Sequence, residues 1–183
     1  MRRVLLITFL VALLSPLADA QGIRLGVSAF GGWNIPIAQE DQSTGTVFGA
    51  MARIRFMSIF VAEPNVTFGK WGNPNPVRGI DLDIEGSKIN SYGINAVIGN
   101  LPGVVGLKPF GFVGGSIYKI TNDDTGYDES KLGYSAGVGI AYGLAPMFDI
   151  NARFTAAVAP QEKGTKKTGY VTGGLTYYFK VGN

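Results

Sequence analysis

Apolar residues recur at every second position along most of the chain after residue 20, most clearly between Lys131 and Gly143. In that stretch one set of alternate positions is apolar: Leu132, Tyr134, Ala136, Val138, Ile140 and Tyr142. The positions between them hold Gly, Ser or Ala. A period of two is the pattern of a β-strand with two different faces. A helix does not fit this segment, because each interior glycine would cost it about 1 kcal/mol relative to alanine.

The same alternation predicts eight strands, at about residues 22–33, 46–57, 60–68, 90–98, 108–120, 131–143, 148–158 and 168–180. The fifth strand carries Phe110, Phe112 and Tyr118, and its alternation is the weakest because Gly114 and Gly115 interrupt it. The third strand contains a proline, Pro64, which has no N–H to donate to a neighbouring strand. We therefore expect a bulge or a local gap in the pairing there.

The connections between these strands alternate in length and polarity. Those near residues 57–58, 99–107 and 144–146 are short or apolar. Those at residues 34–45, 71–86, 121–130 and 159–167 are longer and hydrophilic, and they hold most of the charge outside the strands. No linker or internal repeat is visible, so we expect one domain of consecutive antiparallel strands with four long loops at one end.

The first twenty residues have the pattern of a secretory signal peptide. Arg2 and Arg3 precede an apolar run over residues 4–14, and Ala18-Asp19-Ala20 is a small-x-small cleavage site. An apolar core of that length is too short to span a bilayer as a helix. We predict a signal peptide at residues 1–20 and a barrel domain at residues 21–183, and hence an exported protein.

Composition narrows the chemistry that is possible. The chain has 183 residues with no His and no Cys, which removes Ser-His and Cys-His catalytic pairs and the usual zinc and haem ligands. The net charge is only +3, and the lysines and arginines are scattered singly, so no nucleic-acid-binding surface is expected. We expect no catalytic activity, no cofactor and no metal.

The two strand faces decide which solvent surrounds the protein. If the apolar faces pointed inward, the solvent face of the sixth strand would be only Gly, Ser and Ala from residue 133 to residue 143, unlike a soluble surface. If they point outward into lipid, small residues fill the narrow interior of an eight-stranded barrel, and closure pairs all of the backbone. The sequence therefore predicts an all-β, eight-stranded antiparallel up-and-down transmembrane β-barrel. The alternative is a secreted lipocalin-like binder of an apolar ligand.

The last strand carries the most specific motif, Thr172-Gly173-Gly174-Leu175-Thr176-Tyr177-Tyr178-Phe179. It resembles the C-terminal strand of the small eight-stranded outer-membrane β-barrels of Gram-negative bacteria, the OmpA-like or opacity-type barrel domain. The resemblance implies location in the bacterial outer membrane. It also implies recognition by the barrel-assembly machinery through Thr172, Gly174, Tyr177 and Phe179. The chain departs from the usual form because four residues follow the final aromatic.

Charged residues on the inward faces form the first candidate site, and they are Arg24, Arg53, Arg55, Glu63, Asp149 and Arg153. Arg53 and Arg55 are predicted to face Glu63 across one hairpin. A buried charge without a partner is costly, so these residues should pair or reach trapped water. They would form either a salt-bridge plug or a gated path for ions or small solutes. Eight strands leave little open space, which favours the plug.

Aromatic residues near the strand ends or on the apolar faces form a second set, expected as girdles at the two bilayer interfaces. They are Trp33, Trp71, Tyr92, Tyr118, Tyr134, Tyr142, Tyr170 and Tyr177. The loop carboxylates do not have calcium-loop spacing and are expected to be solvated; they include Asp81, Asp83, Glu85, Asp123, Asp124, Asp128 and Glu129. A weaker hypothesis is that three loop lysines contact lipopolysaccharide phosphates; they are Lys163, Lys166 and Lys167.

These patterns together predict a structural or surface-interaction role, in envelope integrity or adhesion. The expected partners are the lipid bilayer, lipopolysaccharide, the barrel-assembly machinery and an extracellular partner reached through the loops, and we expect a monomer. The alternative within the membrane is a narrow pore for ions or small solutes.

Overall fold

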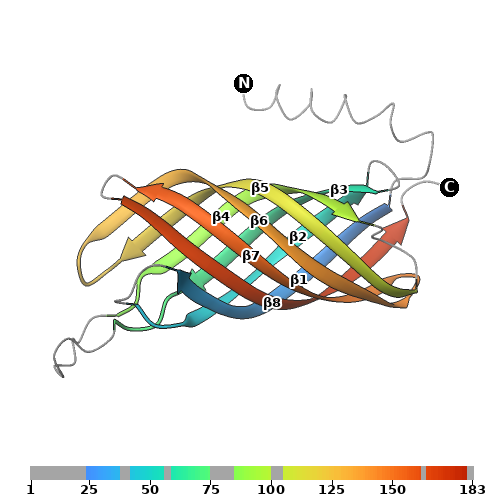
Figure 1. The fold of residues 1–183 in the computed structure, drawn as a ribbon, viewed down its shortest axis with the longest axis horizontal. Helices are drawn as coiled ribbons and strands as arrows, with labels where there is room; N and C mark the ends of the chain where they lie inside the picture. The colour runs from blue at the N-terminus through green and yellow to red at the C-terminus, as the bar shows by residue number, and fades with distance from the viewer. Residues whose placement is uncertain are drawn as a thin grey trace, which may run out of the picture.

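Eight strands close into a single barrel in the computed structural model, which describes residues 24–37, 42–55, 59–74, 85–99, 105–161 and 164–180 (Figure 1). The strands are β1 (Arg24–Ile37), β2 (Gly45–Arg55), β3 (Phe60–Lys70), β4 (Lys88–Gly99), β5 (Gly106–Asn122), β6 (Tyr127–Ala145), β7 (Phe148–Gln161) and β8 (Gly164–Lys180). Each strand is antiparallel to the next, and β1 pairs with β8. The predicted architecture is confirmed, whereas the predicted signal peptide lies outside the described residues.

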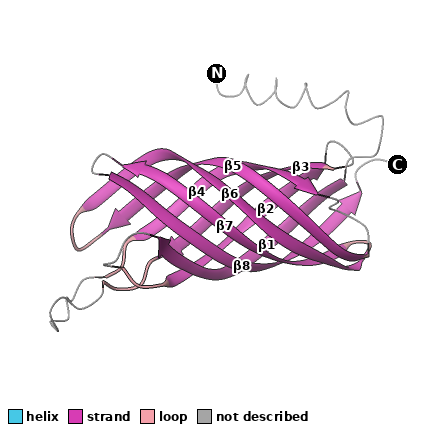
Figure 2. Ribbon diagram, in the orientation of Figure 1, coloured by secondary structure: helices cyan, strands magenta, loops and turns pink. Residues whose placement is uncertain are grey.

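Strands are the regular structure throughout the described part of the chain (Figure 2). Within these residues no helix is long and apolar enough to cross a membrane. We use two names for the ends of the barrel. The terminal end holds Arg24, Lys180 and the turn between β6 and β7, and the loop end holds Trp71 and the turn between β5 and β6.

The apolar face of β6 points outward, as predicted. Tyr134 and Val138 are 62% and 63% exposed on the outer surface of the barrel. The alternate glycines point into the lumen, where space is short: a Cβ atom on Gly137 would lie 2.3 Å from Cζ of Phe112. The apolar side chains of β6 therefore lie on the outside of the barrel and do not enclose a cavity. The alternative of a secreted lipocalin-like barrel that binds an apolar ligand is wrong.

The pairing of β2 with β3 is interrupted beside Pro64. Met51 pairs with Asn65 and Ile54 pairs with Ala62, but the residues between them are not paired. The register is the same on both sides of the interruption, so this is a gap and not a bulge. The gap is one of the two accommodations expected for a residue that has no N–H to donate.

Two of the four predicted long loops are instead continuations of strands. The segment 121–130 forms strand on both sides of a four-residue turn, Asp123 to Gly126, in which Gly126 has a φ of 67°. The segment 159–167 likewise continues β7 and starts β8, with Pro160 paired to Thr165. The prediction was wrong because polar residues at the loop end were interpreted as loop, although these polar segments pair with each other as strands.

Strand β5 presents its aromatic residues to the lumen. Phe110, Phe112 and Tyr118 are buried inside the barrel, and Leu107, Val113 and Ile117 lie on the outer surface. The lumen consequently contains two apolar clusters. The terminal half holds Val61, Val97, Phe110, Phe112 and Ala141. The loop half holds Val47, Trp71, Ile89, Tyr118, Ile120, Ala157, Ala159 and Tyr170.

Candidate functional site in the barrel lumen

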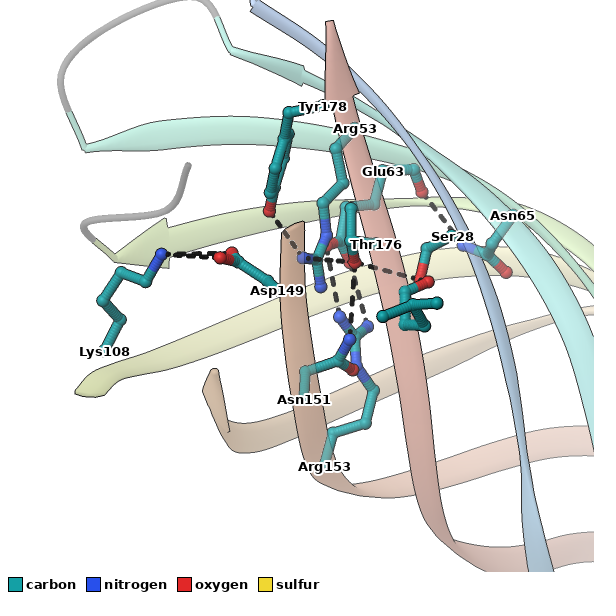
Figure 3. Close-up of polar contacts among 11 residues, drawn as sticks. Ser28, Arg53, Glu63, Asn65, Lys108, Asp149, Asn151, Arg153, Thr176 and Tyr178 are labelled. Atoms are coloured by element: carbon teal, nitrogen blue, oxygen red, sulfur yellow. Dashed lines mark hydrogen bonds and ion pairs between the residues drawn. The ribbon is translucent and has the colours of Figure 1, made fainter. Parts of the chain in front are cut away.

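A single carboxylate in the terminal half of the lumen binds two arginines (Figure 3). Arg53 Nε donates to Glu63 Oε1 at 2.7 Å. Arg153 donates to the same carboxylate through both terminal nitrogens, at 3.0 Å to Oε2 and 3.2 Å to Oε1. Glu63 is 0% exposed, so this charge is fully desolvated and depends on its partners. Glu63 therefore contacts Arg53 of β2, the strand expected to supply its partner, and Arg153 from β7 is an additional partner.

Hydroxyl groups hold the free end of Arg53. Its Nη1 donates to the hydroxyl of Tyr178 at 2.8 Å and to that of Thr176 at 3.0 Å. Thr176 in turn donates to Ser28 Oγ and accepts from Asn151 Nδ2. Strand β8 alternates so that Thr176 and Tyr178 both face inward, which places their hydroxyls directly over the guanidinium group.

Asp149 is held by a lysine that the sequence analysis did not select. Lys108 Nζ lies 3.0 Å from Asp149 Oδ1 and 3.1 Å from Oδ2, and both residues are buried. Lys108 could have been selected from its position, because it lies two residues before Phe110 and therefore shares the inward face of β5. It was missed because both faces of β5 are apolar, so the inward face was not evident.

The three other arginines of the predicted inward set are Arg55, Arg24 and Arg153. Arg55 lies two residues after Arg53 on the same face of β2 and is partly buried. Arg24 begins β1, and its side chain lies outside the described residues. Arg153, besides binding Glu63, lies 5.0 Å from the ring centre of Phe110 and 5.3 Å from that of Phe112. These two rings offer their faces to the guanidinium group and add cation–π attraction.

The loop half of the lumen is closed by an aromatic plug that the sequence analysis placed in the membrane interface. Trp71, Tyr118 and Tyr170 are buried inside the barrel, so their assignment as interfacial girdle residues is wrong. Trp71 Nε1 donates to Asn34 Oδ1 at 3.1 Å, and Thr168 also donates to that oxygen. Closing an eight-stranded barrel leaves space that side chains must fill, and large rings fill it at this end.

The other five aromatic residues of that set lie on the outer surface of the barrel. They are Trp33, Tyr92, Tyr134, Tyr142 and Tyr177. Tyr177 packs against Phe148 with ring centres 4.9 Å apart and stacks on Phe179 at 6.4 Å. Within the proposed C-terminal signal, Thr172 and Gly174 face the lumen on β8 and the two aromatics face outward.

Between the arginine cluster and the aromatic plug lies a cavity of about 50 Å³. All eight strands contribute residues to its lining, most of which are polar. The polar residues are Asn65, Thr67, Ser91, Asn95, Ser116, Ser135, Arg153, Thr155 and Thr172. A water molecule needs about 10–15 Å³ measured in this way, so the cavity has room for a small ion with water.

Opposite charges pair along the outside of the loop end. Lys70 lies 2.6 Å from Glu85, and Lys119 lies 3.2 Å from Asp128. Lys88 Nζ lies 2.5 Å from Asp123 Oδ2, and this hydrogen bond and the lysine charge lower the pKa of the Asp123 carboxyl. Within the described ranges, no three acidic side chains gather closely enough to hold a metal ion.

The loop residues named from the sequence are thus placed only in part. Lys166 lies over the Trp71 ring at 5.8 Å, and Lys167 is exposed on β8. Lys163, Asp81 and Asp83 lie outside the described residues.

The closed barrel, its apolar outer surface and its filled lumen define a transmembrane β-barrel protein. The chain belongs to the family of the outer membrane protein beta-barrel domain, which matches residues 4–179. The predicted family and the predicted location in the bacterial outer membrane are confirmed. A comparison with curated proteins gave no match.

Solved structures of several outer-membrane barrels are similar to this one. Neisserial surface protein A has 16% identity and a TM-score of 0.65, over 87% of this chain and 98% of that one. The N-terminal barrel domain of OprF from Pseudomonas aeruginosa has 18% identity and a TM-score of 0.55, over 85% and 97%. The attachment invasion locus protein Ail of Yersinia pestis has 15% identity and a TM-score of 0.53, over 86% and 99%. At these sequence identities, the comparisons show that this protein shares the fold of those barrels.

Proposed function

We propose that this protein is an outer-membrane anchor that presents the loop end of its barrel at the bacterial surface, in a structural or surface-contact role and without catalysis. The filled lumen carries this proposal. One half holds the Glu63 cluster and the other half holds the Trp71 plug. A barrel packed in this way is a rigid support for the residues at its ends, and it differs in that respect from the wide, water-filled barrels of porins.

The distribution of charge supports a contact role at the loop end. Exposed acidic residues of the described chain lie there, among them Glu85, Asp123, Asp124 and Asp128. The outer wall between the two ends is apolar and suits the bilayer. An extracellular partner, for adhesion or for envelope integrity, would therefore meet the loop end.

Two further partners follow from where the side chains lie. Of the three lysines expected to contact lipopolysaccharide, Lys167 is exposed at the loop end, where phosphates would be within its reach, and Lys166 precedes it on β8. On β8, Tyr177 and Phe179 stack on the outer surface, where the barrel-assembly machinery would read them during insertion. We expect the folded protein to be a monomer.

Cysteine labelling on intact cells tests surface presentation. The chain contains no Cys, so Asp124→Cys and Met147→Cys each provide a single thiol, one in the turn at the loop end and one in the turn at the terminal end. A membrane-impermeant maleimide should label Asp124→Cys on intact cells and Met147→Cys only after the outer membrane is opened. Labelling with the opposite preference, or recovery of the protein in the soluble fraction, would reject the proposal.

A second candidate function is a narrow pathway for ions or small solutes. The polar cavity beside Arg153 is the observation that favours it. Recording from single proteins in planar bilayers separates the two functions. The anchor predicts no regular current steps from the wild-type protein. Steps that disappear when Glu63 or Arg153 is replaced would instead assign a conducting role to the lumen.

A further inference from the structure

Among the described residues, the charged groups that are buried in the terminal half of the lumen do not balance. The cations are Arg53, Arg153 and Lys108, and the anions are Glu63 and Asp149. Asp149 forms an ion pair with Lys108. The guanidinium groups of Arg53 and Arg153 therefore share a single carboxylate, that of Glu63. Hydrogen bonds from hydroxyls and the Phe110 and Phe112 rings reduce the cost, but they do not supply a negative charge.

Each of these two arginines also has a donor without a partner. Arg53 Nη2 and Arg153 Nε are buried and make no hydrogen bond, and of the two residues Arg153 lines the cavity of about 50 Å³. A buried N–H without a partner destabilises the folded state, and more so when the group is charged. The unbalanced charge and the unpaired donor of Arg153 therefore meet at the same cavity.

The rest of the cavity lining suits an anion. It supplies hydroxyl groups, including those of Ser91, Ser116, Thr155 and Thr172, together with side-chain amides. Hydroxyls and amides donate hydrogen bonds readily. No carboxylate is among the described residues that line the cavity, so the lining itself contributes no negative charge.

We propose that this cavity binds one monovalent anion of the size of chloride, beside Arg153 Nε, as the counter-ion of the Arg53–Glu63–Arg153 cluster. Water would satisfy the N–H donor but would leave the charge unbalanced. A phosphate or sulfate dianion would reverse the imbalance and is a poor fit to so small a space. The bound ion completes the electrostatics of the lumen and stabilises the folded barrel.

Anion-dependent unfolding tests this directly. The full protein in phospholipid vesicles is unfolded with urea, because guanidinium chloride would itself supply the ion. Chloride replaces gluconate, which is too large for the cavity, at constant ionic strength. A single site on the folded state lowers the unfolding equilibrium constant tenfold for each tenfold rise in chloride above its dissociation constant. Equal unfolding constants in chloride and in gluconate at every concentration would overturn the proposal and leave water in the cavity.

Two variants locate the effect. Arg153→Gln removes the excess charge and should abolish the dependence on chloride. Thr172→Val keeps the shape of the cavity wall but removes a hydroxyl, and should weaken chloride binding roughly 2- to 10-fold. Thr46→Val, on the outer surface of β2, is the matched control and should bind chloride like the wild type. A chloride dependence that is the same in all three variants would place the ion elsewhere.

X-ray diffraction tests the same proposal on the wild-type protein, so the test does not depend on whether Arg153→Gln folds. Crystals of the wild-type protein grown with bromide in place of chloride should show an anomalous peak inside the lumen, within hydrogen-bonding distance of Arg153 Nε. Bromide peaks found only on the outer surface of the barrel would contradict the assignment.

Discussion

Arg53 and Glu63 lie directly opposite each other at the point where the backbone pairing of β2 with β3 is interrupted, and their side chains join the two strands at 2.7 Å. Pro64 has no N–H to give to β2, so a side-chain contact bridges a stretch that the backbone leaves open. Arg153 then extends the link across the lumen to β7. A polar cluster of this kind is costly when any one member is removed.

Glu63→Gln should strongly destabilise the barrel. The change leaves two buried guanidinium groups without their carboxylate, and breaking a buried pair from one side typically costs about 3–5 kcal/mol. Urea unfolding in vesicles measures the free energy. Adding Arg153→Met to Glu63→Gln should recover part of the loss, because one stranded charge is then gone. A double-mutant cycle in which the two changes simply add would contradict the coupling between Glu63 and Arg153.

Replacing Val138 by arginine tests which face of β6 meets lipid. Val138 is exposed on the outer wall, and an arginine at the bilayer midplane should cost about 2–4 kcal/mol. Ser135→Thr changes a residue that lines the small lumen cavity and should cost little, since one methyl group has room there. Both variants are compared with the wild type by unfolding titration in lipid. Similar losses for the two variants would mean that the assigned facing is incorrect.

The pair between Lys88 and Asp123 at the loop end predicts a pH effect. Lys88 lowers the pKa of Asp123 in the folded protein, so the folded state favours the ionised carboxyl more than the unfolded state does. The stabilisation is therefore present above the unfolded pKa of about 3.9 and is lost as the pH falls below it through the folded value. Lys88→Gln should raise the titration midpoint of Asp123 measured by carbon-13 NMR. Lys167→Gln, also at the loop end, should leave that midpoint unchanged.

The fold was predictable because the barrel obeys one rule along its whole length. Lipid outside and a narrow lumen inside force residues of opposite kinds onto alternate positions, and β6 shows this in almost every residue. The inward charges Arg53, Glu63, Asp149 and Arg153 followed from the same alternation. The contact of Arg53 with Glu63 also followed, because one hairpin joins their strands. The contact of Glu63 with Arg153 did not follow, since these residues lie 90 positions apart in sequence and meet only across the closed barrel.

The aromatic plug was mispredicted for a different reason. Tyr170 lies two residues before Thr172, and Trp71 lies four residues after Thr67, so each shares an inward face with a polar neighbour. Alternation alone would have placed both in the lumen. Their positions at strand ends suggested girdle residues, but a barrel of eight strands needs large side chains inside as well as outside.

The two tryptophans of the chain provide a direct measurement of this difference. Trp33 is 62% exposed on the outer wall, and Trp71 is 1% exposed within the plug. Trp71→Phe leaves only Trp33, and Trp33→Phe leaves only Trp71. In vesicles that contain lipids with brominated acyl chains, fluorescence of the Trp33-only variant should be strongly quenched, because bromine quenches on contact. Fluorescence of the Trp71-only variant should be nearly unchanged, because the barrel wall separates its ring from the acyl chains. Equal quenching of the two variants would mean that Trp71 faces lipid and that the loop half of the lumen lacks its plug.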